Sequence, residues 1–200
     1  MVQESAYKAM TRERFLFQEM RITARLLGRG MGRQEAIQEI AESNLFQYPT
    51  EKSLRPIANV CMNRLEALGS QALVSALATS PVNDAKQICL YSVMRQNRLF
   101  YEFMTTVIGE KYSTLNYTFG SADMNAFFAR MREQIDAVAA WSDESIQRTK
   151  STIREILAST GFLDKPTSNT LNPVRLCRTL ENEMRGSAEQ AALAAFNCFV

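Results

Sequence analysis

The stretch from Ser53 to Leu65, SLRPIANVCMNRL, combines an apolar face with an unusual polar one. Arg55, Asn59 and Asn63 follow one another at intervals of four residues, so a helix would align them on one face. Arginine pairs with guanine edges and asparagine with adenine edges in the major groove, and both contact phosphate. A helix with this spacing could therefore follow a groove of duplex DNA. The alternative is an ordinary polar face whose amides bond to a neighbouring helix or loop.

Positive charge is concentrated near the N-terminus, although the formal net charge of the 200 residues is only +2. Residues 1–33 contain seven lysines and arginines against three glutamates, a net charge of +4. Such a segment attracts phosphate. Together with Lys52, which precedes the opening stretch, Arg25, Arg29 and Arg33 are candidate DNA contacts. A solvated helix face rich in arginine would have the same composition.

Several classes of chemistry are excluded or disfavoured. The chain contains no histidine, which removes Ser-His-Asp and Cys-His catalysis and His-ligated zinc sites. The glycine-rich GRGMG lacks the Gly-Lys-Ser/Thr of a phosphate loop. The four cysteines have no Cys-x-x-Cys spacing and are interpreted as reduced, buried thiols. We therefore expect a non-enzymatic protein with no cofactor and no metal site.

Neither a membrane segment nor a signal peptide is apparent. No apolar run reaches the ~20 residues that a transmembrane helix needs. The polar VQESAYKAM at the N-terminus lacks the apolar core of a signal peptide. The sequence predicts a cytoplasmic protein that does not enter the membrane.

Hydrophobic periodicity predicts an all-α fold, a compact multi-helix bundle. Ser53, as N-cap, places Pro56 in the first turn of its helix, where the missing N–H needs no partner. Asn44, Ser70 and Gly109 are expected to cap or end neighbouring helices. The expected helices cover residues 11–27, 33–43, 53–68, 71–78, 83–108, 121–138 and 143–160.

Residues 142–184 predict a segment like a winged helix. A helix capped by Ser142 is followed by extended pieces at 161–163 and 170–172, and a further helix begins at Asn172-Pro173. Four cations would give this segment a basic face: Arg148, Lys150, Arg154 and Lys165.

We divide the chain into residues 1–69, a DNA-binding part like a helix-turn-helix, and residues 70–200, which contain the winged-helix-like segment. Both parts are expected to belong to one compact unit. The link from Asn44 to Ser53 is longer than the three- or four-residue turn usual in a helix-turn-helix, which leaves the docking geometry open.

Three segments together resemble the BrxA family of bacterial BREX phage-defence systems. They are ARLLGRG, AESNLFQYPTEKSLRPIANVCMNRLEAL, and the pair NRLFYEFMTTVIGEKY and WSDESIQRTKSTIREILASTGFLD. The resemblance covers nearly the whole chain. It implies a small all-helical accessory protein that binds double-stranded DNA and has no enzymatic activity. Such a protein would work beside the methyltransferase, ATPase and phosphatase-like components of the system.

Two other functions stay open. A protein-interaction scaffold could assemble the defence complex without touching DNA. RNA binding is less favoured, because no aromatic cluster on a strand platform is apparent for base stacking. Formation of homo-oligomers also stays open. Salt-sensitive binding to a duplex would distinguish the DNA-binding protein from the scaffold.

Overall fold

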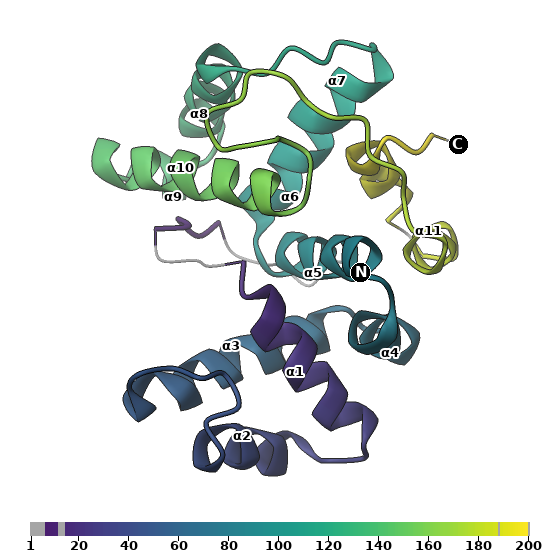
Figure 1. Ribbon diagram of the computed structural model, residues 1–200. Helices are drawn as coiled ribbons and strands as arrows, with labels where there is room; N and C mark the ends of the chain where they lie inside the picture. Colours follow the sequence, from purple (N-terminus) through teal and green to yellow (C-terminus); the bar gives the residue numbers. More distant parts are fainter. Residues whose placement is uncertain (1–6, 12–14, 188, 200) are drawn as a thin grey trace. The chain divides into compact units, whose positions relative to one another are not determined.

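The computed structural model of the protein describes residues 7–11, 15–187 and 189–199 (Figure 1). These residues form helices and irregular connections without a β-strand, and one isolated antiparallel bridge joins Thr118 to Thr170. The predicted all-α class is confirmed.

Contacts group the chain into two compact units. The inserted unit is Leu16–Gln96, and the terminal unit combines the residues before Leu16 with those from Asn97 onward. The boundary that we predicted after residue 69 falls inside the inserted unit, whereas the contacts divide the chain after residues 15 and 96.

The inserted unit is built around its first helix. Its elements are α1 (Phe17–Gly28), α2 (Arg33–Glu42), the 3-10 turn η1 (Glu51–Ser53), α3 (Leu54–Ala67), α4 (Gln71–Thr79) and α5 (Val82–Gln96). α1 contacts α2, α3, α4 and α5 (Figure 1). It buries Met20 and Ala24 completely, as its apolar stripe requires.

Two capping signals in the inserted unit are confirmed, whereas Ser53 lies in η1 and makes no N-cap hydrogen bond with its side chain. Asn44 has a φ of 43°, the left-handed conformation expected just after the end of a helix. The side chain of Ser70 accepts a 3.3 Å hydrogen bond from the backbone N–H of Leu73 in the first turn of α4. Because α3 begins at Leu54, Pro56 lies in its first turn as predicted.

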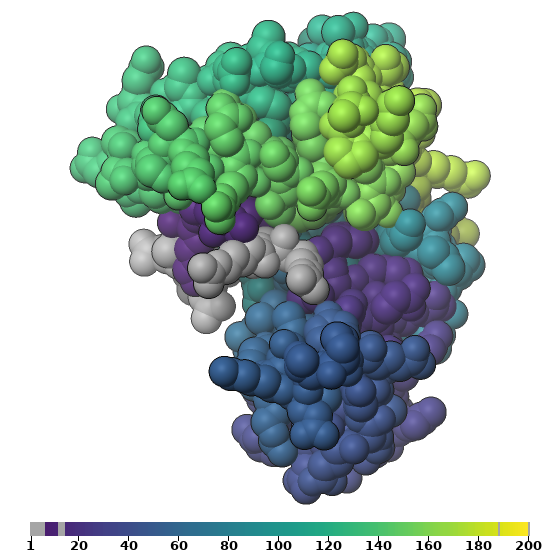
Figure 2. Space-filling model, turned by 60° about the vertical axis from the view of Figure 1, so that its left-hand side comes forward, coloured from purple at the N-terminus to yellow at the C-terminus, as the bar shows by residue number. Residues whose placement is uncertain are grey.

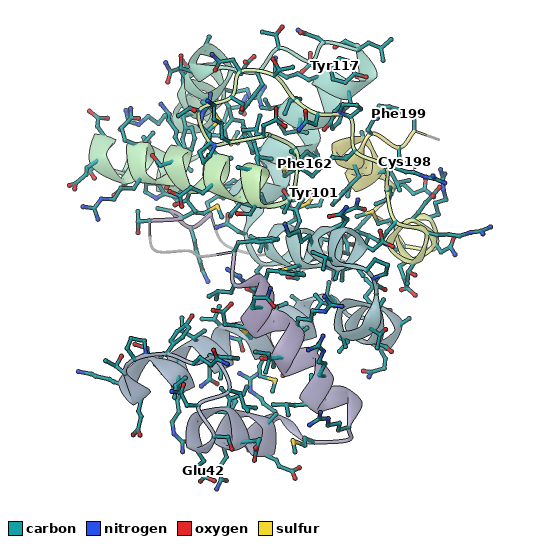
Figure 3. The ribbon with its side chains drawn as sticks, in the orientation of Figure 1. Glu42, Tyr101, Tyr117, Phe162, Cys198 and Phe199 are labelled. Atoms are coloured by element: carbon teal, nitrogen blue, oxygen red, sulfur yellow. The ribbon has the colours of Figure 1, made fainter. Side chains whose placement is uncertain are left out.

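The terminal unit has an aromatic core. Its elements are α6 (Arg98–Glu102), the π-helical η2 (Phe103–Ile108), α7 (Gly109–Ser113), α8 (Ser121–Gln134), α9 (Asp136–Ala139), α10 (Asp143–Ser159), α11 (Arg178–Arg185) and the 3-10 helix η3 (Gln190–Phe196). The rings of Phe103 and Phe127 meet edge to face with centroids 5.2 Å apart. The ring of Phe162, which follows α10 (Figure 3), contacts the ring of Tyr112 in a tilted arrangement and that of Phe196 edge to face.

The first helix begins later than we predicted. α1 starts at Phe17, and Leu16 before it has a left-handed φ of 54°. Met10 is completely buried in the terminal unit, and its N–H donates to Thr149 Oγ1 at 3.1 Å. Packing of this segment into the terminal unit accounts for the missing helix at Thr11, although residues 12–14 lie outside the described part of the chain.

The long helix predicted over residues 83–108 is interrupted at Asn97. Asn97 Oδ1 accepts the N–H of Phe100 at 3.2 Å and so caps α6, while Nδ2 donates to the carbonyl of Lys8 at 3.0 Å. The predicted stop at Gly109 is also wrong, because the helix continues to Ser113. Gly109 serves close packing instead, since a Cβ there would lie 3.1 Å from the Cβ of Ala194.

The predicted wing is not confirmed. Asn172 N–H bonds to the Phe162 carbonyl at 2.9 Å, but Leu171 N–H bonds to Tyr117, so the second piece pairs chiefly with the segment before α8. The helix expected from Pro173 begins only at Arg178, after an extended stretch. Ser142 does cap α10, accepting the N–H of Ser145 at 3.2 Å.

Candidate nucleic-acid interface

The two faces of α3 have opposite character. Leu54, Ala58 and Cys61 are completely buried. On the other side, Arg55, Asn59, Asn63 and Glu66 are all exposed. This stripe, which we call the α3 face, runs from a cation at the start of the helix to an acid near its end. Figure 2 shows the side chains of α2 and α3 at the molecular surface, in blue.

Arg33 of α2 occupies the middle of the α3 face. Its Nη2 donates to Asn63 Oδ1 at 2.7 Å and to Asn59 Oδ1 at 3.2 Å. Its Nη1 lies 2.6 Å from Glu66 Oε1. The asparagines therefore follow the alternative interpretation of the sequence, in which their amides bond to a neighbouring helix.

The start of α2 fixes the position of Arg33. It is the first residue of that helix, directly after Gly32, whose N–H donates to Glu35 Oε2 at 3.3 Å. α2 packs against α3 and buries Ala36, Ile37 and Ile40. The backbone of Arg33 is consequently fixed beside α3, and its guanidinium is held by Asn59, Asn63 and Glu66. Its side chain is 33% exposed.

Arg25 and Arg29 differ in their environments. Arg25 Nε donates to the Ala78 carbonyl at 3.3 Å, and Arg21 donates to the Ser80 carbonyl at 2.6 Å. These arginines thus bind carbonyls at the C-terminal end of α4, where cations are favoured. Arg29, which follows α1, is exposed.

Lys52 and Arg55 lie at the N-terminal end of α3, and both are exposed. The N-terminus of a helix carries about half a positive charge, so cations are unfavourable there unless an anion is bound. A phosphate would be attracted by the two side chains, whereas the helix end itself offers few free N–H groups, because the Leu54 N–H bonds to the Glu51 carbonyl and Pro56 has none.

The cations predicted in the winged-helix-like segment are partly engaged. Arg148 pairs with Glu144 at 2.6 Å on the exposed side of α10. Arg154 donates to the carbonyls of Pro166 and Ser168, at 2.8 and 3.1 Å, and lies over the ring of Phe119. Lys165, in the loop after α10, is exposed.

Lys150 lies near a second cation, Arg132, which the sequence did not indicate. Its Nζ donates to Asn125 Oδ1 at 2.7 Å and lies over the ring of Phe128. Burial lowers the pKa of Lys150, and the positive charge of Arg132 lowers it further. Arg132 itself pairs with Asp143 at 2.7 Å. A bound anion would favour the charged form of Lys150.

Sequence reasoning missed the partner of the asparagines. Arg33 appeared only as one cation of a basic segment, and Glu66 did not appear at all. A signal was present, because Glu66 continues the α3 stripe three residues after Asn63. The predicted DNA contacts fall into both units: Arg25, Arg29, Arg33, Lys52, Arg55, Asn59 and Asn63 in the inserted unit, and Arg148, Lys150, Arg154 and Lys165 in the terminal unit.

Two buried cysteines, Cys61 and Cys89, and a buried arginine lie in the core of the inserted unit. Arg64 is only 1% exposed. Burial raises the pKa of Cys61 and Cys89 to about 12, although the positive charge of Arg64 opposes the rise. Both cysteines therefore stay protonated at neutral pH, which makes them poor nucleophiles and metal ligands.

Two kinds of feature are absent from the described residues. Among residues 7–11, 15–187 and 189–199, no three His, Cys, Asp or Glu side chains gather where they could hold a metal ion. Within the same ranges, none of the helices has the length and apolar character needed to span a bilayer.

Comparison with known proteins places the chain in a family. A family model for BrxA matches residues 5–186. A protein of Bacillus cereus (strain H3081.97) described as "BREX protein BrxA" is 33% identical over 170 residues, which cover 84% of each chain. The crystal structure of an uncharacterized protein from Magnetospirillum magneticum has a similar fold, with a TM-score of 0.79 at 18% identity over 95% of this chain and 97% of that one. The chain belongs to the BrxA family.

Proposed function

We propose that this protein is a non-enzymatic accessory protein of a BREX phage-resistance system and binds double-stranded DNA mainly through the phosphate backbone. The observation that carries the DNA-binding part is the pair of exposed cations, Lys52 and Arg55, at the N-terminal end of α3. Both side chains attract phosphate, whichever sequence the duplex has.

Other cations extend the binding capacity beyond α3. Arg29 is exposed in the inserted unit, and Lys165 is exposed in the terminal unit. Lys150 and Arg154 are one turn apart on α10, and each keeps part of its side chain at the surface. Because phosphate contacts carry no sequence information directly, this set favours binding with little sequence preference.

The BREX part of the proposal rests on family membership and on the relative named as a BREX protein. The partners that follow are the methyltransferase, ATPase and phosphatase-like components of such a system. We propose that the protein contacts these partners in the cytoplasm, where the methyltransferase and DNA are found together. The lack of histidine supports a role without acid–base chemistry at neutral pH.

The salt dependence of duplex binding tests the proposal. If about four to six phosphates are neutralised, log K should fall with log salt at a slope of about −4 to −5. Changing Lys52 and Arg55 together to alanine should reduce the slope by about two units and weaken binding to all duplexes alike. Arg178→Ala removes an exposed cation of α11 that is not one of the proposed contacts, and it should leave the slope unchanged.

A protein-interaction scaffold is the second candidate, and the charge of α2 favours it. Glu35 and Glu42 are exposed and Glu39 is half-buried on this helix. Glu42 lies at the C-terminal end of α2 (Figure 3). This acidic side repels phosphate and suits a basic protein surface. A salt slope near zero, together with co-purification of another BREX component, would support the scaffold over the DNA-binding protein.

A further inference from the structure

We propose that Arg33 prevents the two asparagines of α3 from reading adenine, a role that rests on the proposed duplex binding. A guanidinium has five N–H donors and no acceptor. Because Arg33 Nη2 bonds to Asn59 and Asn63, the oxygen of each amide must face it. The orientation of both amides follows from the chemistry of their shared partner.

Adenine recognition needs a different arrangement. An asparagine that reads adenine accepts a hydrogen bond from the N6 amino group and donates one to N7. Here an approaching amino group would bring its hydrogens next to the positive charge of Arg33. Acceptors such as phosphate oxygens are attracted to the same place. With Arg33 present, the α3 face therefore favours acceptors and disfavours the adenine amino group.

The amide of Asn59 is also held against rotation. Asn59 Nδ2 donates to the carbonyl of Arg55 at 3.0 Å, so turning this amide would break bonds at both ends. Glu66 holds Nη1 of Arg33 at 2.6 Å. Arg33 is the first residue of α2, and the hydrogen bond from the Gly32 N–H to Glu35 fixes the start of this helix. It acts as a positioning residue: it sets what the asparagines present to DNA.

The test compares two duplexes of equal length at one salt concentration, one of A·T pairs and one of G·C pairs. Arg33→Met keeps an unbranched side chain but removes the guanidinium donors and the charge. Arg29→Met is the matched control, because it removes an exposed cation that precedes α2 and, within the described residues, bonds to neither asparagine. Arg33→Ala provides the same measurement if Arg33→Met folds poorly.

We expect the wild type and Arg29→Met to show no preference for the A·T duplex beyond about twofold. Arg33→Met should prefer it by about fivefold or more, equivalent to about 1 kcal/mol, the lower end for one bidentate pair. Adding Asn59→Ala and Asn63→Ala to Arg33→Met should abolish this preference. That last variant separates amide readout from the narrow minor groove of A·T tracts.

Two results would overturn the inference while leaving the proposed function intact. The first is that the Arg33→Met variant binds both duplexes equally. The other is a wild-type preference for A·T that disappears when the asparagines are changed. Failure of the wild type to bind any duplex would instead overturn the proposed function, and the inference with it.

Discussion

The Arg33 guanidinium donates a 2.7 Å hydrogen bond to the amide oxygen of Asn63 and so links the start of α2 to the exposed side of α3. A poor helix former therefore has a defined partner in the folded protein. The asparagines at 59 and 63 form half of a contact between two helices. Their presence on an exposed face needs no DNA to explain it.

A double-mutant cycle should detect this link. Arg33→Ala and Asn63→Ala are expected to be coupled by about 0.5–1 kcal/mol in the free energy of unfolding, as for a partly exposed hydrogen bond from a cation to a neutral acceptor. The cycle cancels the higher helix propensity of alanine, which would otherwise offset the loss. Denaturant unfolding of the four proteins measures the coupling. The same cycle with Arg29 in place of Arg33 should give a value near zero, and a zero value for both would contradict the contact.

Gly109→Ala should destabilise the terminal unit. The added Cβ would lie 3.1 Å from the Cβ of Ala194 and 3.3 Å from its carbonyl carbon, so the backbone of η3 would have to give by a few tenths of an ångström. Overpacking of this kind costs about 1–3 kcal/mol. Gly28→Ala is the matched control, because nothing lies within 4 Å of its added Cβ and it ends a helix. Thermal unfolding should show a lower melting temperature for Gly109→Ala and a higher one for Gly28→Ala. Equal effects of the two changes would contradict the packing at Gly109.

Met10→Ala should lower stability by about 2–3 kcal/mol, because it empties a completely buried site. The exposed Lys8 nearby uses only its backbone carbonyl to bond Asn97. Lys8→Ala should therefore have little effect. Denaturant midpoints for the two variants provide the measurement. Similar midpoints for Met10→Ala and the wild type would mean that the N-terminal segment does not pack as described.

The acid sensitivity of the terminal unit should depend on Asp123. Burial would raise its pKa, but hydrogen bonds from Lys111 and the Gly120 N–H outweigh burial and hold the pKa below the ordinary value of 3.8. A carboxyl whose pKa is lower in the folded than in the unfolded protein stabilises the fold at pH values above its unfolded pKa. This stabilisation is lost as the pH falls through its folded pKa.

The variant Asp123→Asn lacks this titration. The difference in stability between wild type and variant should be constant near neutral pH and shrink as pH falls below about 4. Unfolding curves across that range would show it. A difference that stays constant down to pH 2 would mean that the ion pair between Lys111 and Asp123 does not contribute.

Much of the secondary structure could be predicted because its causes are local. Ser70 and Ser142 cap helices with their own hydroxyls, and Asn44 adopts the left-handed conformation beside a helix end. Pro56 lies in the first turn of α3, where its missing N–H needs no partner. Each of these effects acts within about one helical turn, so neighbouring residues suffice to identify it.

The errors occurred where distant residues decide the conformation. Asn97 ends one helix and starts the next partly because its amide reaches Lys8. The helix continues through Gly109, and η3 packs so close that a Cβ there would lie 3.1 Å from the Cβ of Ala194. The segment at 170–172 pairs with residues 117–119, so no independent wing forms. A pattern along the chain carries no information about such partners.

The sequence by itself determined the all-α class, most helix boundaries, the apolar side of α3 and membership of the BrxA family, because periodicity and caps are local and families share core patterns. The tertiary structure alone decided the division into an inserted and a terminal unit and the partner of Asn59 and Asn63. Arg33 lies 26 residues before Asn59 and 30 before Asn63. Whether an exposed amide is available to a ligand depends on which distant side chain packing brings to it.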